Sequence, residues 1–421
     1  MKKIIKLILS LIIKGSSMII TIFILRWLNS NLTPLQLQDF NLASLYSSTF
    51  ITITSLGLGI ILIKLYNSNE EESEFNKFWS SLFAYQLLLT LASLIFFFII
   101  KEYLNLNSIY ILPLLFVAQM LLAIDGNYKA ITDYHNKSIQ FTITEFLSKI
   151  IILILLYSFL FFNILKIDND IYYVIILFST SLMQLILDSY LQRKHIKWVK
   201  PNISILLKHR KLIGLVALNM SIFIITSNLD RFFIKFFNYN EFELNSYINA
   251  YKIFEIMMII EQIVLPIFIA NLIKNITIKG LRTDQIWKSK WTWLILINGA
   301  FSIILFLLAS YFVLPFIDKN GIYLAKSYEA VPYLAIAALF SSISYCISQY
   351  FLYRSKIKYE TYSLIIYLIL SIVGYIYLIP PLGGKGAAIA TLIGFSSLFI
   401  SRIIFFIFDF KFTTLPINKI I

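Results

Sequence analysis

The chain has 421 residues, of which 59% are hydrophobic and 14% charged, with a mean hydropathy of +0.80 and a formal net charge of +14. An ordinary soluble domain is about 25% charged, so this composition excludes a soluble globular protein. Apolar runs long enough to cross a bilayer as helices recur along the chain, whereas the alternation typical of barrel strands is absent. The sequence therefore predicts an all-α, polytopic membrane protein.

The first predicted element is a helix retained at the N-terminus. The residues MKKIIKLILSLIIKGSSM have the basic start of a signal peptide, but Lys6 and Lys14 interrupt the apolar stretch and no A-x-A-like cleavage site follows. Further spans follow, separated by polar segments that carry turn residues. The twelve expected spans cover residues 7–28, 37–63, 79–100, 109–128, 141–163, 171–190, 212–235, 245–273, 291–315, 330–352, 361–379 and 387–408.

A basic segment at 191–211 divides the predicted spans into two sets of six. We therefore expect an N-terminal lobe at 1–190 and a C-terminal lobe at 212–421, joined by this linker. Repeated halves are common in transporters, which hold their substrate between them. An amphipathic part of the linker would suit anionic membrane lipids, but a plain cytoplasmic loop is the simpler interpretation.

The distribution of basic residues predicts the orientation. If both termini are cytoplasmic, the inner loops and tails hold 24 of the 36 Lys and Arg residues, and the outer loops hold six. Short cytoplasmic loops retain such an excess of basic residues, so the ratio supports the span count and the orientation together. The net positive charge then needs no nucleic-acid partner.

Several kinds of chemistry are missing from the sequence. No phosphate-binding loop for ATP and no complete dinucleotide fingerprint occurs. The three histidines, His135, His195 and His209, fall in predicted cytoplasmic loops without metal-ligand spacing, and Cys346 is the single cysteine. The outer loops are at most about fifteen residues long by these boundaries, which leaves little room for a catalytic domain. We expect no catalytic residues, cofactor or metal, and movement of a substrate across the membrane.

Charged residues nevertheless lie within the predicted spans. A charge at the bilayer centre costs at least ~2.5–3.5 kcal/mol, so such residues should face the bundle interior, pair, or snorkel from a helix end. Pairing along one helix is expected for Glu145 with Lys149 and for Lys252 with Glu255. The residues near the span ends are expected to snorkel or pair: Arg26, Asp188, Asp230, Arg231 and Arg402.

Four of the basic residues are candidates for binding an anionic cargo. A cavity that needs cations takes a phosphate or diphosphate, to which lysine supplies a point charge and arginine a fork for two oxygens. Lys14 lies beside the small residues Gly15-Ser16-Ser17, which would allow another helix or a polar ligand to come close. The candidates are Lys14, Arg26, Arg231 and Lys252.

Four acids are candidates for a step linked to a proton or cation gradient. Burial favours the protonated form of a carboxyl, and a nearby lysine opposes it. Glu261 has no basic residue three or four positions away, so it is the acid most expected to stay protonated. The candidates are Glu145, Asp188, Glu255 and Glu261.

Three stretches resemble polysaccharide-biosynthesis flippases of the Wzx type. The N-terminal stretch carries the family's basic-Gly-Ser start, its L-[ST]-P loop and a later Gly-Leu-Gly before a basic residue, here Lys14-Gly15-Ser16, Leu32-Thr33-Pro34, and Gly57-Leu58-Gly59 with Lys64. SYINAYK at 246–252 is similar to the family's G-x-Y-x-x-A segment, although Asn245-Ser246 stands where glycine is usual. GGKGAAIATLIG at 383–394 is similar to the G-A-A-x-A-T entry into the last span.

The resemblance covers essentially the whole chain and implies the multidrug/oligosaccharidyl-lipid/polysaccharide exporter fold, with two six-helix lobes around a central cavity. It implies a flippase that carries an undecaprenyl-diphosphate-linked oligosaccharide to the outer leaflet of the bacterial inner membrane during O-antigen or capsule synthesis. An ion gradient would drive it, and a polysaccharide polymerase and a chain-length regulator would be its partners.

Two other functions remain open. A drug–cation antiporter of the same fold would need an acid-lined cavity, but the internal charges are six basic and five acidic. An O-antigen polymerase or membrane glycosyltransferase would resemble a multi-span protein with a long outer loop, which the predicted topology lacks. The sequence therefore favours the flippase.

Overall fold

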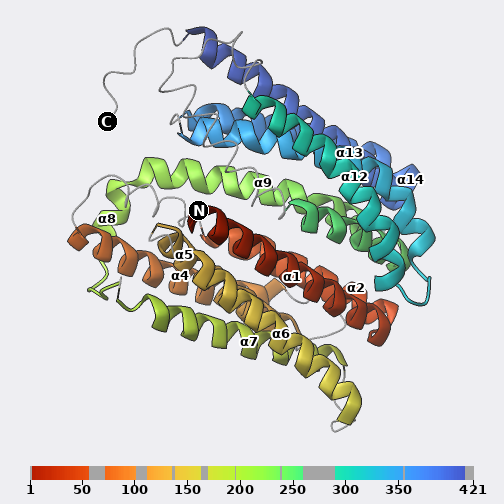
Figure 1. The fold of residues 1–421 in the computed structure, drawn as a ribbon, viewed down its shortest axis with the longest axis horizontal. Coiled ribbons are helices and arrows are strands. Elements are labelled where there is room, and N and C mark those ends of the chain that lie inside the picture. The colour runs from red at the N-terminus through yellow and green to blue at the C-terminus, as the bar shows by residue number, and fades with distance from the viewer. Residues whose placement is uncertain are drawn as a thin grey trace. The chain divides into compact units, whose positions relative to one another are not determined.

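The computed structural model describes residues 2–55, 72–100, 111–134, 138–162, 169–194, 196–237, 239–258, 290–353 and 356–412. Regular structure in these ranges is helical, and seven of the helices are long and apolar enough to cross a membrane (Figure 1). Contacts divide the chain into two compact units, Met1–Ile224 and Ile225–Ile421, and each is described by itself.

The first unit is a bundle of long helices. Helix α5 packs against α2 and α7, and α6 packs against α1 and α7. Helix α4 packs against α2, α5 and the short helix α8. The elements are α1 (Lys2–Asn31), α2 (Pro34–Ser55), α4 (Glu72–Ile100), α5 (Ile111–Tyr134), α6 (Ser138–Phe162), α7 (Asn169–Gln192), α8 (Ile203–Lys208) and the start of α9 (Arg210–Phe236).

The Leu32-Thr33-Pro34 motif starts a helix. The Oγ1 of Thr33 accepts a hydrogen bond from the backbone N–H of Gln36 at 3.3 Å, and the Oε1 of Gln36 accepts one from the N–H of Thr33 at 3.0 Å. This reciprocal pair is a capping box, and Pro34 occupies the first helical position, where a missing N–H costs nothing. The motif therefore has a local structural role at the beginning of α2.

Aromatic side chains fill the interior of the first unit. Trp27 and Trp79 are each 1% exposed, and Trp79 packs edge-on against Tyr128 with ring centroids 5.2 Å apart. Large apolar residues such as Leu88 and Ile154 are exposed instead. Exposed apolar side chains on long helices suit a lipid environment, in which backbone polar groups must be satisfied within the helix.

The basic linker is docked on the beginning of α4. The backbone N–H groups of Lys197, Val199 and Asn202 donate to the side chains of Asn76, Ser80 and Ser81, at 2.9, 3.0 and 2.6 Å respectively. Further along, Lys208 forms an ion pair with Glu74 at 3.3 Å. These contacts hold the linker against the first unit as an extended strap that leads into α8.

The second unit contains the end of α9, helical residues 241–258, and three further helices. Helix α13 packs against both α12 and α14. The buried side chains at its centre include Phe306, Phe351 and Phe395, each at most 1% exposed. The three helices are α12 (Lys290–Ile317), α13 (Leu324–Tyr353) and α14 (Ile357–Phe412).

Helix α14 is a hairpin of two antiparallel helices. A Cβ placed on Gly374 would lie 2.9 Å from the Cβ of Ala390, and one placed on Gly386 would meet the carbonyl of Leu378. These contacts pair residues in reverse order, so the chain turns back between them, at Gly383, whose φ is 56° and ψ is −133°. The two spans predicted at 361–379 and 387–408 correspond to the two arms, and small residues let the arms approach closely.

The turn of this hairpin is fixed by an acid from another helix. Glu243 accepts a hydrogen bond at 2.8 Å from the backbone N–H of Gly384. A Cβ on Gly383 would lie 2.6 Å from the Oε1 of Glu243, and the positive φ at that position also favours glycine. The Gly-Gly pair of the third family-like stretch therefore serves this turn.

The twelve predicted spans coincide with helices wherever their residues are described, although their ends differ by a few residues. About half of the 245–273 span and the last eight residues of the 37–63 span lie outside the described residues, and so do Gly57-Leu58-Gly59 and Lys64 of the first family-like stretch. The division between the two compact units falls within α9. The expected lobes at 1–190 and 212–421 and the separate linker at 191–211 stay a prediction.

Candidate functional site

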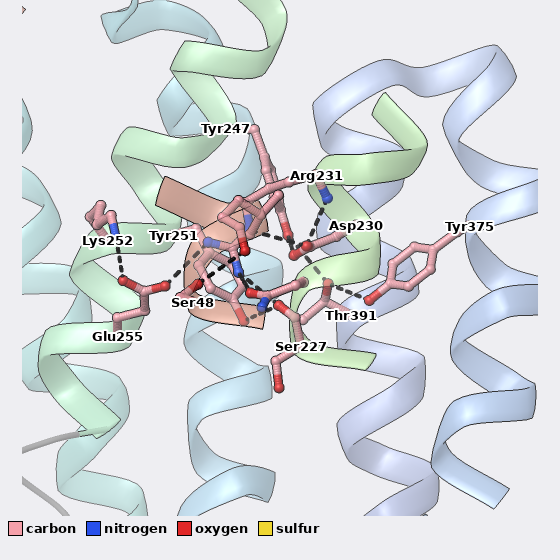
Figure 2. A network of polar contacts seen from close by, with 12 residues as sticks. Ser48, Ser227, Asp230, Arg231, Tyr247, Tyr251, Lys252, Glu255, Tyr375 and Thr391 are labelled. Atoms are coloured by element: carbon pink, nitrogen blue, oxygen red, sulfur yellow. Dashed lines mark hydrogen bonds and ion pairs between the residues drawn. The ribbon is translucent and has the colours of Figure 1, made fainter. Parts of the chain in front are cut away.

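A charged cluster occupies the second unit where α9 and residues 241–258 meet (Figure 2). Its centre is Arg231, whose side chain is 6% exposed. The guanidinium donates from Nε to Asp230 at 3.3 Å and from NH1 to Glu255 at 3.2 Å. It also donates to the side-chain oxygen of Asn228 at 2.5 Å and to the backbone carbonyl of Ser227 at 2.8 Å. The chain's own acceptors therefore occupy all three guanidinium nitrogens.

Glu255 bridges two cations. Its Oε1 accepts from Arg231, and its Oε2 accepts from the ammonium of Lys252 at 2.7 Å. The Lys252–Glu255 pair predicted from sequence is thus confirmed, with side chains 32% and 36% exposed. Since Arg231 is almost fully buried, Lys252 is the cation of this cluster that a ligand can reach.

Aromatic hydroxyls surround the acid side of the cluster. Tyr247 donates to Asp230 at 2.6 Å, and its hydroxyl also lies 3.3 Å from that of Thr391 on α14. Tyr375 reaches the same threonine at 3.4 Å, as Figure 2 shows. The guanidinium of Arg231 lies over the ring of Tyr251, 4.3 Å from its centroid, a cation–π geometry. The second and third family-like stretches meet here, through Tyr247 and Thr391.

The four formal charges of this cluster cancel. Asp230 and Glu255 balance Arg231 and Lys252, and every buried member has a partner at hydrogen-bonding distance. Such a network is favourable when complete and costly when one member is removed. The cluster therefore fastens α9 to residues 241–258 and presents a single accessible ammonium beside a carboxylate.

A second polar cluster lies inside the first unit, where α5, α6 and α7 pack. Asp188 is fully buried, and its two carboxyl oxygens lie 3.0 and 2.9 Å from the hydroxyl of Thr144. Asp125, 1% exposed, accepts a hydrogen bond at 2.6 Å from the amide of Gln184. The carboxyls of Asp125 and Asp188 also interact with each other directly.

Asp188 was expected to snorkel or to form an ion pair, because it lies near a predicted span end, and the structure differs from that expectation. The side chain neither snorkels nor forms an ion pair within the described residues, because α7 turns it inward towards α5 and α6. Arg402 was expected to snorkel or pair, and it pairs: it is buried against Glu360 and also donates to Ser344 at 2.7 Å. Both arrangements depend on how the helices pack.

Glu145 and Lys149 form the predicted pair along α6, with the ammonium 3.1 Å from the carboxylate. Their side chains are 37% and 30% exposed. Glu145 also acts electrostatically on Asp125 and Asp188. It is therefore at the edge of the buried acid cluster, with its own cation beside it.

The remaining predicted site residues are placed as follows. Lys14 and Arg26 both lie on α1, half-buried and twelve residues apart, which is about 18 Å along a helix. Apart from its own helix, no described atom lies within 4 Å of a Cβ placed on Gly15, so no other described helix approaches at that glycine. Glu261 lies outside the described residues. The binding and coupling roles assigned to all these residues stay predictions.

Sequence reasoning missed Asp125 and Glu360. Asp125 falls within the predicted span 109–128, but its neighbours Gly126 and Asn127 give the appearance of a loop. Glu360 precedes the predicted span 361–379 by one residue. Their charge alone could have identified both residues as candidates, since an acid at or inside an apolar run needs a partner.

Comparisons with known proteins give matches of structure. No family model and no curated relative matches the chain. The lipid II flippase MurJ, in an inward closed conformation, matches with a TM-score of 0.70 and 16% identity over 95% of this chain and 89% of its own. An inward-facing multidrug-resistance MATE transporter of the MOP superfamily matches with a TM-score of 0.69 and 12% identity over 97% of this chain and 100% of its own.

The chain therefore shares its fold with these solved transporters. A third similar structure is a transporter of the MOP superfamily from Pyrococcus furiosus, described by the reverse polarity of its binding pocket, with a TM-score of 0.66 and 12% identity over 96% of this chain and 95% of its own. Identities this low show the fold alone. The predicted fold class, an all-α polytopic membrane protein with about twelve spanning helices, is thereby confirmed.

Proposed function

We propose that the protein is a flippase that moves an undecaprenyl-diphosphate-linked oligosaccharide, an O-antigen or capsule repeat unit, across the bacterial inner membrane by alternating access. The observation that carries the proposal is the likeness in fold, over 95% of the chain, to a lipid II flippase. In this proposal both termini are cytoplasmic, an ion gradient drives transport, and a polymerase and a chain-length regulator handle the delivered cargo.

The charges support an anionic cargo. Lys252 is one-third exposed and pairs with Glu255, so a diphosphate competing with that carboxylate gains an ammonium without disturbing the buried Arg231. Lys14 and Arg26 offer two more half-buried cations on α1. Arg231 acts in this proposal by holding Glu255 in place. Phosphate oxygens bind such cations strongly, because the hydrogen bonds are assisted by charge.

A multidrug antiporter is the second candidate, because MATE transporters share the fold and the first unit buries two acids. A cationic drug would be drawn to Asp125 and Asp188 rather than to Lys252. An O-antigen polymerase or another membrane enzyme gains no support from the comparisons, since the similar structures are transporters.

Complementation of a flippase-deficient strain tests the proposal. Surface polysaccharide, normalised to the amount of this protein in the membrane, should return with the unaltered chain. The double variant Lys14→Gln, Lys252→Gln should lose most of that activity while its membrane level is kept, and Lys14→Arg should retain more activity than Lys14→Gln. Each change removes charge and retains most of the side chain's length.

Lys326→Gln is the matched control, because Lys326 is 54% exposed and pairs with Glu243 and Glu329 at the surface of the second unit. It should leave surface polysaccharide unchanged. Full polysaccharide from the double variant would show that these lysines do not carry the cargo. Efflux of a cationic drug by reconstituted protein, with no rescue of polysaccharide, would favour the antiporter.

A further inference from the structure

The two buried acids of the first unit come from different helices and lie together without a cation. Asp125 belongs to α5 and Asp188 to α7, and these helices pack along each other. Their carboxyls interact directly, and no ion pair joins either of them to a basic residue in the described part of the chain. Two carboxylates in contact away from water repel strongly, and one proton between them removes the repulsion.

The donors around the pair are neutral and limited in number. Thr144 has a single hydroxyl proton, and its Oγ1 also lies 2.8 Å from the carbonyl of Phe141. Gln184 donates to one oxygen of Asp125, whose other oxygen, Oδ1, has no hydrogen-bond donor within the described residues. An unsatisfied buried carboxylate oxygen is costly, so a proton on this pair would supply the missing donor.

A second, independent feature leads from the pair to the helix end. Gln184, Asp188 and Gln192 recur every four residues on one face of α7, and all three are buried. Neither amide atom of Gln192 has a partner among the described residues, although its side chain is fully buried. Gln192 is the last residue of α7, so its amide, which has no partner among the described residues, is suited to hold a proton-carrying water between the pair and the basic linker.

We propose that Asp125 and Asp188 share one proton and form the proton-binding site of this transporter. The coupling role rests on the proposed function, whereas the shared proton does not. Among the described residues, the charged or titratable groups facing the pair are Glu145 from α6 and Tyr128 from α5, and Lys149 pairs with Glu145. The oxygen of Asp125 that lacks a hydrogen-bond donor in the described interior favours a proton over a sodium ion, because a proton supplies a donor and a sodium ion does not.

Infrared spectroscopy of the full-length protein in membranes tests the site without any cargo. A protonated carboxyl gives its own carbonyl-stretching band, which should be present at neutral pH and disappear in alkali. The double variant Asp125→Asn, Asp188→Asn should lose the band. Asp409→Asn is the matched control, because Asp409 is also buried, at 2% exposed, but has a basic partner, Lys356, at 3.1 Å.

The outcomes separate the alternatives. Absence of the band in the unaltered protein, or an unchanged band in the double variant, would overturn the shared proton. Loss of the band on adding sodium at constant pH would make the pair a sodium site instead. Full gradient-driven transport by the double variant, at equal membrane level, would leave the proton but remove its coupling role. Failure of the unaltered protein to rescue polysaccharide would count against the flippase alone, because the infrared result stands by itself.

Discussion

In the second unit, Arg231 and Lys252 meet Asp230 and Glu255, so four formal charges cancel. In the first unit, Asp125 and Asp188 meet neutral amide and hydroxyl donors. A cancelled network can stay charged in a dry interior, and losing one member breaks it. Two buried carboxylates without a cation can instead share a proton, which binds and dissociates reversibly. The comparison indicates that the second unit uses buried charge to hold helices together, and the first uses it to bind a proton.

Replacing Arg231, the central cation of the second unit, should lower stability more than any other single change. Arg231→Gln would leave two acids without their shared partner, and breaking a buried ion pair in this way costs about 3–5 kcal/mol. We expect a large fall in thermal stability and in monodisperse protein after detergent extraction. Lys235→Gln, one turn further along α9 and only half-buried, is the control and should have a much smaller effect.

Adding Asp230→Asn to Arg231→Gln should restore part of the loss, because Asp230 loses its ion pair with Arg231, whereas Glu255 keeps its pair with Lys252. If Arg231→Gln were as stable as the unaltered protein, the cluster would not hold α9 to residues 241–258. In that case the guanidinium would be available for another ligand.

The tyrosine on the acid side should have an intermediate effect. Tyr247→Phe removes the 2.6 Å hydrogen bond to the carboxylate of Asp230, and hydrogen bonds to charged groups contribute about 1.5–3 kcal/mol. Tyr375→Phe is the matched control, since that hydroxyl only approaches the neutral Thr391 at 3.4 Å. Thermal unfolding should place Tyr247→Phe well below Tyr375→Phe, and equal effects would mean that the charge of Asp230 is not stabilised by this bond.

What the sequence predicts well is local. Hydropathy identifies the helices, because each span must satisfy its own backbone. Spacing along one helix predicts the Glu145–Lys149 and Lys252–Glu255 pairs. Spacing along one helix does not predict contacts between helices. Arg231 pairs with Glu255, 24 residues further along the chain, and Asp125 interacts with Asp188 on another helix. Those contacts depend on helix rotation and packing, which a single sequence does not encode visibly.

The half-exposed pair on α6 should contribute little. Lys149→Gln removes a charge whose partner is 37% exposed, and a pair of this kind along a helix is worth about 0.3–0.5 kcal/mol. Thermal unfolding of the variant should lie close to that of the unaltered protein. A loss as large as that of Arg231→Gln would indicate that Glu145 faces lipid and depends on its lysine.

Replacing one acid of the first unit should change stability least, and in the opposite direction to Arg231→Gln. Asp188→Asn keeps the shape of the side chain, keeps an acceptor for Thr144 and adds an amide donor beside Asp125. Since it removes the like-charge contact and leaves no cation orphaned in the described interior, we expect unfolding at the same or a slightly higher temperature. Asp230→Asn is the matched control in the second unit and should lower stability, because it withdraws a carboxylate from Arg231. The unfolding temperatures of the two variants therefore show whether each acid stabilises the fold as part of an ion pair or binds a proton. A loss of stability in both variants would mean that Asp188 is ionised and held by a cation, as Asp230 is.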